Sequence, residues 1–320
     1  MKNETKIVAT AIDDNYVWPF LIMIFSATRN SRVPFDLVLG YEQHQLSREK
    51  MDIIVFVLRM QRLKFSFIEL KSGISGNFNN YITSTTFLRL CLADSLESNF
   101  LWVDSDVLLL PDWTEIFSIG EANISTNICL AVRDPLSEST MNFEDSKNHA
   151  LRRQGANYFN AGILYLNPKR WQELNYPAIW RQLHEDSSKL GFQFNDQCIL
   201  NYLSYEKCVL QPSIYNFLVR DSLERPLYKI RVAHFAGGRK PWHFSILHLF
   251  LFPPSKHAQL FRSYGLHEIF LLIKVSINDP KFVLRIFLLM RSSRTKYNLR
   301  RSIKLVFVSN LNNLKDILRR

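Results

Sequence analysis

The chain has 320 residues, of which 47% are hydrophobic and 22% are charged, a balance that builds a sizeable core and excludes a globally disordered protein. Its net charge of +11 is uneven, because residues 242–320 hold 14 Lys and Arg against 3 Asp and Glu, whereas the preceding residues hold 26 of each sign. The neutral main body lacks the positive potential that attracts phosphate backbones, so we expect no nucleic-acid partner.

Short apolar runs alternate with helical patterns in the first half of the chain. The expected strands are 6–12, 35–39, 65–70, 100–103 and 128–132, and the expected helices lie near 18–28, 47–63 and 80–96. Strands that alternate with helices pair in parallel through right-handed crossovers. The pattern therefore predicts an α/β fold with a doubly wound sheet.

Acidic residues follow two of these expected strands. Asp104 and Asp106 come directly after the strand at 100–103, and Asp13 follows the first strand. Ligands of such sheets bind beyond the carboxyl ends of the strands, so both acidic clusters should lie at one edge. Asp is also a common turn and helix-capping residue, which is the structural alternative. Two carboxylates near a buried edge repel each other, however, unless a cation or hydrogen bonds offset the repulsion.

Three further stretches stand out in the second half. YFNAGILYLNPKRW reads as a strand that leads into a helix at Pro168, a good first helical position. FNDQCILNYL predicts a helix capped by Asn195 or Asp196. VAHFAGGRKPWH reads as a strand followed by a glycine-containing loop.

Two carboxylates and a histidine form a set of metal ligands. With His234 as the third ligand, oxygen and imidazole donors suit Mn²⁺ or Mg²⁺, and a bound diphosphate would complete the octahedron. A lone histidine in an apolar run can equally be a core residue. The AGGRK that follows favours the ligand role, because glycines let the backbone approach phosphate oxygens and Arg239 and Lys240 neutralise them.

Six motifs in order carry a resemblance to a known family. They are IVATAIDDNYV, TSTTFLRL, LWVDSDVLLL, FNAGILYLN, NDQCILN and HFAGGRKPW, and they extend from about Lys6 to His243. In this order they resemble the family 8 glycosyltransferases, which include bacterial lipooligosaccharide galactosyl- and glucosyltransferases and the glycogenins. The resemblance implies a GT-A type fold, a single mixed, mostly parallel nucleotide-sugar-binding sheet flanked by helices, with the transferase domain at 1–244.

The resemblance also assigns roles to individual residues. Mn²⁺, or Mg²⁺ in its place, would be held by Asp104, Asp106 and His234. The residues assigned to the uridine, ribose and diphosphate are Ala11, Asp13, Asn15, Ser105, Gly237 and Lys240, with Asp13 facing the uracil. Those assigned to the donor sugar are Arg89, Asp134, Asn160, Ala161, Asp196 and Gln197, of which Asp134, Asp196 and Gln197 are the expected catalytic residues. For Arg89 and Asp134, a surface or ion-paired role is the alternative.

The implied reaction transfers galactose or glucose from a UDP-sugar to a saccharide or lipid-linked saccharide acceptor, with retention of the anomeric configuration, in surface-glycan synthesis such as that of lipopolysaccharide. A double displacement needs a nucleophile on the far face of the sugar, where Gln197 is an amide and a poor nucleophile. We therefore expect same-face attack by the acceptor hydroxyl. The family's Asp-Gln-Asp helix reads Asp196, Gln197, Cys198 here, so one carboxylate is missing.

The tail from residue 245 to 320 combines aromatic and aliphatic residues with Arg and Lys. This composition predicts amphipathic helices on an anionic membrane surface, and the alternative is a helical subdomain that packs on the sheet. The apolar run at the start of the sequence is too short for a signal peptide, and the uncharged runs fall short of the roughly 20 residues that a spanning helix needs, so we expect no transmembrane segment. We expect a cytoplasmic enzyme bound peripherally to the inner membrane, with its four cysteines reduced.

Two other functions fit parts of the sequence. A haloacid-dehalogenase-like phosphatase or phosphotransferase also places a nucleophilic Asp after an apolar strand, which here would be Asp104, but that strand lies near the start of the chain in such enzymes. A non-catalytic membrane-associated binding module would need only the tail. Metal-dependent release of UDP separates the transferase from both.

Overall fold

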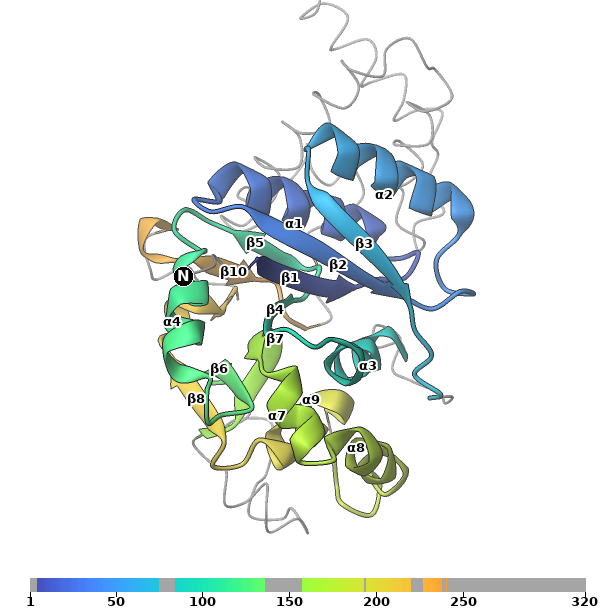
Figure 1. Cartoon of the computed structure of the whole chain (residues 1–320), viewed down its shortest axis with the longest axis vertical. Coiled ribbons are helices and arrows are strands. Elements are labelled where there is room, and N and C mark those ends of the chain that lie inside the picture. Colours follow the sequence, from blue (N-terminus) through green and yellow to red (C-terminus); the bar gives the residue numbers. More distant parts are fainter. Residues whose placement is uncertain are drawn as a thin grey trace, which may run out of the picture. The chain divides into compact units, whose positions relative to one another are not determined.

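The computed structural model describes residues 5–74, 84–135, 157–192, 194–219, 227–237 and 240. The chain divides into two compact units, Met1–Gly238 and Arg239–Arg320. All of the helices and strands given below belong to the first unit (Figure 1). The tail expected at 245–320 lies outside the described residues.

The main sheet has seven strands in the order β3-β2-β1-β4-β7-β6-β8. They are β1 (Lys6–Ala11), β2 (Phe35–Tyr41), β3 (Lys64–Glu69), β4 (Phe100–Val103), β6 (Cys129–Arg133), β7 (Phe159–Leu166) and β8 (Cys208–Gln211). β1, β2, β3 and β4 pair in parallel, and β6 is parallel to β8. Only β7 runs against its neighbours β4 and β6. The carboxyl ends of β1, β4 and β6 therefore share one edge with the start of β7.

A second sheet of three strands adjoins the aspartate motif. It consists of β5 (Val107–Leu109), β9 (Phe217–Leu218) and β10 (Val232–His234), in the order β5-β10-β9. β5 begins one residue after Asp106, and β10 pairs with it antiparallel, so that His234 lies opposite Val107. The pairing of two short apolar runs far apart in sequence brings the histidine back to the aspartates.

Helices cover both faces of the main sheet. They are α1 (Val17–Asn30), α2 (Arg48–Met60), α3 (Leu88–Ser95), α4 (Glu115–Asn123), α7 (Pro168–Glu173), α8 (Tyr176–Glu185) and α9 (Asn195–Leu203), with 3₁₀ turns at Ser84–Phe87, Ser213–Tyr215 and Leu227–Lys229. In Figure 1, α1 and α2 lie on the other side of β1–β3 from α3. Ala9 and Ala11 of β1 face a core with residues of α3, α7, α8 and α9. Small residues on this strand let the helices approach closely.

The strands are buried along their length wherever helices cover the sheet. All four residues of β4 and all eight of β7 are buried, which explains why these strands read as continuous apolar runs. α1 tolerates Pro19 because it lies in the first turn, where backbone N–H groups have no partner within the helix. The apolar run around this proline is therefore a buried core helix.

Most predicted elements are present, with differences at their ends. The helix expected at 80–96 is a 3₁₀ turn from Ser84 followed by α3, and residues 80–83 lie outside the described residues. The helix of FNDQCILNYL begins at Asn195, but its N-cap is Phe194, without a side-chain cap. The predicted capping by Asn195 or Asp196 is thus wrong, because the carboxylate of Asp196 pairs with Arg89 instead.

All four cysteines are free thiols, as expected, and three of them are buried. Among the residues that the structure describes, no helix combines the length and the apolar character that crossing a membrane requires.

Candidate active site

The two aspartates of the motif lie in the turn that joins the two sheets. Asp104 directly follows β4, and its backbone N–H donates to the carbonyl of Gly162 in β7 at 2.8 Å. Asp106 directly precedes β5, and its carbonyl accepts from the N–H of Phe235 at 3.0 Å. Backbone hydrogen bonds to β7 and to the end of β10 therefore hold both sides of the turn.

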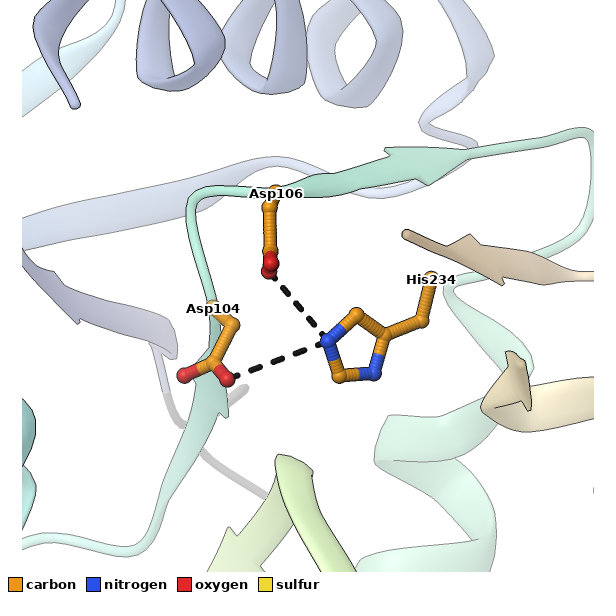
Figure 2. Close-up of side chains that lie close together, drawn as sticks. All are labelled: Asp104, Asp106 and His234. Atoms are coloured by element: carbon orange, nitrogen blue, oxygen red, sulfur yellow. Dashed lines mark ion pairs between the residues drawn. The ribbon is translucent and has the colours of Figure 1, made fainter. Parts of the chain in front are cut away.

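His234 points at this pair of carboxylates. Its Nε2 lies 3.2 Å from Oδ1 of Asp106 and 4.0 Å from Oδ2 of Asp104 (Figure 2). One ligand atom from each of the three side chains lies within 4.8 Å of the others. His234 is only 3% exposed, so its position is set by packing. Two carboxylates and one imidazole at this spacing fit a divalent cation such as Mn²⁺ or Mg²⁺.

Gly162 provides the space that the imidazole fills. A Cβ atom at this position would lie 2.2 Å from Cε1 and 2.6 Å from Nδ1 of His234. Real Cβ contacts of that length do not occur, so any larger residue at 162 has to displace the ring. The glycine of the FNAG motif is therefore part of the site, because its lack of a side chain leaves room for the imidazole.

Arg89 of α3 links the aspartate motif to α9. Its Nη2 lies 3.1 Å from Oδ1 of Asp104, and its Nε lies 3.0 Å from Oδ2 of Asp196. Its Nη1 donates to the carbonyl of Ala161 at 2.5 Å, and the guanidinium lies 5.1 Å from the centre of the Trp102 ring. Burial alone would lower the pKa of Arg89, but the carboxylates of Asp104 and Asp196 together raise it.

Contacts to both of its oxygens orient the carboxylate of Asp104. Oδ1 accepts from the indole Nε1 of Trp102 at 2.8 Å and from Arg89, whereas Oδ2 faces His234. The Arg89 guanidinium offsets part of the negative charge of the motif. Arg89 is thus ion-paired within the protein, and its expected contact with the donor sugar stays a prediction.

Asp196 is buried beside Arg89 at the start of α9. Burial is the largest cause that raises its pKa, to about 6, and it outweighs the opposing effect of the Arg89 guanidinium. The charge of Asp104 raises the pKa of Asp196 further. A carboxyl group with this pKa changes its protonation state close to neutral pH.

Asp134, Asn160 and Gln197 form a hydrogen-bonded network at the same edge of the sheet. The carboxylate Oδ2 of Asp134, just beyond β6, accepts from the amide of Asn160 at 3.3 Å and from the amide of Gln197 at 3.2 Å. The side-chain oxygen Oε1 of Gln197 accepts from the backbone N–H of Ala161 at 3.0 Å. These residues, which are expected to surround the donor sugar, thus lie together and are joined by hydrogen bonds.

The residues expected at the nucleotide follow β1. Ala11 ends the strand, Asp13 is buried, and its carboxylate accepts from the N–H of Asn15 at 2.8 Å, which closes a turn. Tyr16, which the sequence reasoning missed, lies in the same loop. Burial and then the charges of Asp106 and Asp13 raise the pKa of its hydroxyl.

Ser105, Gly237 and Lys240 are the other residues expected at the ribose and the diphosphate. Ser105 is buried in the turn between the two aspartates. Gly237 has φ +88, a conformation that favours glycine, with nothing within 4 Å of a Cβ built on it. Lys240 is buried and belongs to the second compact unit, so its assignment to the diphosphate stays a prediction.

Cys198, which replaces a family carboxylate, lies behind the donor-side network. It is fully buried, its sulfur is 3.3 Å from the hydroxyl of Tyr158, and it accepts from the N–H of Phe194. Tyr158 in turn accepts from the amide of Gln197 at 3.4 Å. The side chain at this position packs within the protein, so it is a packing residue, for which the loss of the carboxylate is expected to be harmless.

Asn216, like Gly162, is a further residue that the sequence reasoning missed. It contacts His234 and Asn160 from the segment before β9. The signal in the sequence is weak, since a single asparagine in IYNFLV is typical of a turn. Gly162 could have been found from its motif, because a glycine inside a buried strand indicates a close approach of another group.

Comparison with known proteins identifies the family. Residues 7–245 match the model of glycosyl transferase family 8. A Haemophilus influenzae protein that carries the name of a glycosyltransferase is 27% identical over 259 residues, which are 74% of this chain and 73% of that protein. An Escherichia coli lipopolysaccharide 1,2-glucosyltransferase is 21% identical, over 76% of this chain and 74% of its own length.

The fold also matches a solved structure. The galactosyltransferase LgtC, in complex with donor and acceptor sugar analogues, superimposes with a TM-score of 0.61 at 22% identity, over 81% of this chain and 95% of that chain. At this identity the likeness establishes the fold. It confirms the predicted α/β architecture with a mostly parallel sheet flanked by helices.

Proposed function

This chain belongs to glycosyltransferase family 8 and is a glycosyltransferase, and we propose that it transfers galactose or glucose from a UDP-sugar to a saccharide acceptor, with retention of configuration and dependence on a divalent metal. The observation that carries the proposal is the convergence of Asp104, Asp106 and His234. The names of the glucosyltransferase and galactosyltransferase relatives support a hexose and an acceptor in surface-glycan synthesis.

Asp104, Asp106 and His234 would hold the cation, Mn²⁺ or Mg²⁺. Bound there, it would stabilise the negative charge that develops on the diphosphate as the sugar departs. The protein contributes the orientation of the ligands. Arg89 and Trp102 fix one oxygen of Asp104, so that the other faces His234.

The donor-side network supports a same-face attack by the acceptor hydroxyl, with its proton passing to the departing phosphate. The side-chain oxygen of Gln197 already accepts from the backbone N–H of Ala161, and the carboxylate of Asp196 forms an ion pair with Arg89. The side-chain amide of Gln197 is a poor nucleophile, and the ion pair with Arg89 disfavours attack by the Asp196 carboxylate. Intact-protein mass spectrometry during turnover tests this, and an adduct of one hexose on Asp196 or Gln197 would overturn it.

The metal and donor are tested together by UDP release. The purified protein is incubated with UDP-glucose or UDP-galactose, with Mn²⁺ or with a chelator, and the free UDP is measured. We expect UDP release only with the metal, at a rate roughly a thousandfold lower after Asp106→Asn. Asp36→Asn, which removes a surface carboxylate paired with Lys64, is the matched control. Equal UDP release with the chelator would contradict metal dependence.

The sugar and the acceptor require a separate screen. Several nucleotide sugars are offered with a rough lipooligosaccharide acceptor, and the product is identified by mass. The proposal expects a gain of one hexose from a UDP donor. Transfer from a guanosine or cytidine donor in preference to the UDP-sugars would contradict the assignment of the uridine pocket.

We further propose that residues 245–320 attach the enzyme to the cytoplasmic face of the inner membrane. The support is the charge of residues 242–320, 14 basic against 3 acidic side chains among apolar ones. Near an anionic surface each basic residue contributes about 1 kcal/mol. The full chain should sediment with phosphatidylglycerol vesicles, whereas a chain ending at 244 should stay in the supernatant. The binding of the full chain should weaken as salt is added. Equal binding by both chains would refute the attachment.

A further inference from the structure

Asn216 lies behind His234, on the side away from the aspartates. It is 2% exposed, between the 3₁₀ turn Ser213–Tyr215 and β9. Its Oδ1 is 2.9 Å from Nδ1 of His234, and its Nδ2 donates to Oδ1 of Asn160 at 2.9 Å. The asparagine therefore connects the imidazole to the donor-side network.

The orientation of the Asn160 amide follows from its other partners. Its Oδ1 accepts from the backbone N–H of Gly162 at 2.9 Å, and a backbone N–H can only donate. Its Nδ2 faces the carboxylate of Asp134 at 3.3 Å. A reversed amide would place NH₂ against the Gly162 N–H and an oxygen against the carboxylate. The oxygen of Asn160 therefore faces Asn216.

This fixes the amide of Asn216 in turn. Because the oxygen of Asn160 accepts, Asn216 must turn its NH₂ group towards it and its own oxygen towards His234. An oxygen at 2.9 Å from Nδ1 requires a hydrogen on that nitrogen. The imidazole thus carries a hydrogen on Nδ1, and Nε2 is the nitrogen that faces Asp104 and Asp106 and would bind a cation.

We propose that Asn216 is a positioning residue, which holds His234 in the tautomer and ring orientation needed for a metal ligand. The inference rests on the proposed metal-dependent function. Groups that hydrogen-bond the second nitrogen of a metal-bound histidine typically contribute about 10- to 100-fold to metal affinity. The hydrogen bonds run from the Gly162 N–H through Asn160 and Asn216 to His234. One backbone N–H of β7 therefore determines which nitrogen of the His234 ring carries a hydrogen.

A purely structural role makes a different prediction. An asparagine that only fills space and stabilises the segment before β9 would change the unfolding temperature when replaced, and would leave ion affinity unchanged in the folded protein. A positioning residue acts through His234, so its replacement should have no further effect once His234 is absent. A double-mutant cycle on Mn²⁺ affinity separates the two roles.

The experiment measures free Mn²⁺ by electron paramagnetic resonance during titration of the full chain. The variants are Asn216→Leu, His234→Ala and the double replacement, with Asn216→Ala if the leucine variant does not fold. Asn167→Ala is the matched control, since Asn167 is also buried and hydrogen-bonded but caps α7. Unfolding temperatures are recorded for all variants.

We expect Asn216→Leu to raise the dissociation constant of Mn²⁺ about 10- to 100-fold, and Asn167→Ala to leave it unchanged. The double variant should bind as His234→Ala does. If the native chain binds Mn²⁺ and Asn216→Leu binds it equally well, or if the two effects simply add, the role given to Asn216 is wrong. If the native chain binds no Mn²⁺, the proposed metal site itself fails, and with it the positioning role.

Discussion

The two halves of the active site are built from different chemistry. In the metal half, two carboxylates face one imidazole, with a ligand atom of each within 4.8 Å of the others. In the donor half, the carboxylate of Asp134 accepts from two side-chain amides, those of Asn160 and Gln197. The first half gathers negative charge that a cation would offset, and the second already offsets its charge by hydrogen bonds. Replacements in the two halves should therefore separate ion binding from transfer.

The largest expected effect is in the metal half. Asp106→Asn removes a charged ligand that lies 3.2 Å from His234. Loss of several kcal/mol of leaving-group stabilisation should lower the transfer rate roughly a thousandfold. Mn²⁺ affinity should fall with it, as titration would show. If the Asp106→Asn variant kept the Mn²⁺ affinity of the native chain, the ion would have to bind at another site.

Asp196 lies between the two halves and gives a pH dependence. Its pKa is raised from 3.8 to about 6 in the folded chain, so the unfolded chain releases this proton first as the pH rises. Its ionisation should therefore cost roughly 3 kcal/mol of stability, absent below pH 4 and complete above pH 6 to 7.

Denaturant unfolding of the native chain and of Asp196→Asn over this pH range measures the cost. The stability of the native chain relative to the variant should fall as the pH rises through about 4 to 6. A difference that stays constant with pH, or that grows, would mean that the Arg89 ion pair outweighs burial.

Gly162→Ala should damage the metal half through packing. The added Cβ would lie 2.2 Å from the His234 ring, so the ring must move and Mn²⁺ affinity should fall tens-fold, about the loss expected for a misplaced ligand. Gly120→Ala places a Cβ 2.5 Å from the Tyr165 ring, outside the site, and serves as the control. Both variants should lose stability, but only the first should lose Mn²⁺. Equal Mn²⁺ affinities would contradict the packing argument.

The smallest expected effect is in the donor half. Gln197→Ala removes hydrogen bonds to Asp134 and Ala161, and the transfer rate should fall about tenfold, which corresponds to one net hydrogen bond. Mn²⁺ affinity should not change. Steady-state kinetics beside a titration would show this, and a joint loss of both would mean that the two halves are not separable.

The sequence was sufficient to predict the strand ends and the chemistry that they carry. Asp13 and Asp104 follow parallel neighbouring strands, so their common edge follows from the alternation of strands and helices. The metal ligands were predicted from a carboxylate pair and a histidine beside glycines. In both cases a local pattern indicated the chemistry, and the family resemblance supplied the pairing.

Contacts between distant segments could not be predicted in this way. The three-stranded sheet joins β5, β9 and β10, whose strands of two or three residues are too short to show a period. Without that sheet nothing in the sequence places Asn216 behind His234. The capping of α9 was wrong for a related reason, since Asp196 has a distant partner in Arg89 that local rules do not include.

The most direct measurement is the anomalous scattering of Mn²⁺ in crystals of the full chain grown with the ion and UDP. The proposal predicts one strong peak at bonding distance from carboxylate oxygens of Asp104 and Asp106 and from Nε2 of His234, with Asn216 still bonded to Nδ1. A peak elsewhere, or an imidazole turned away from the two aspartates while the ion is bound, would contradict it.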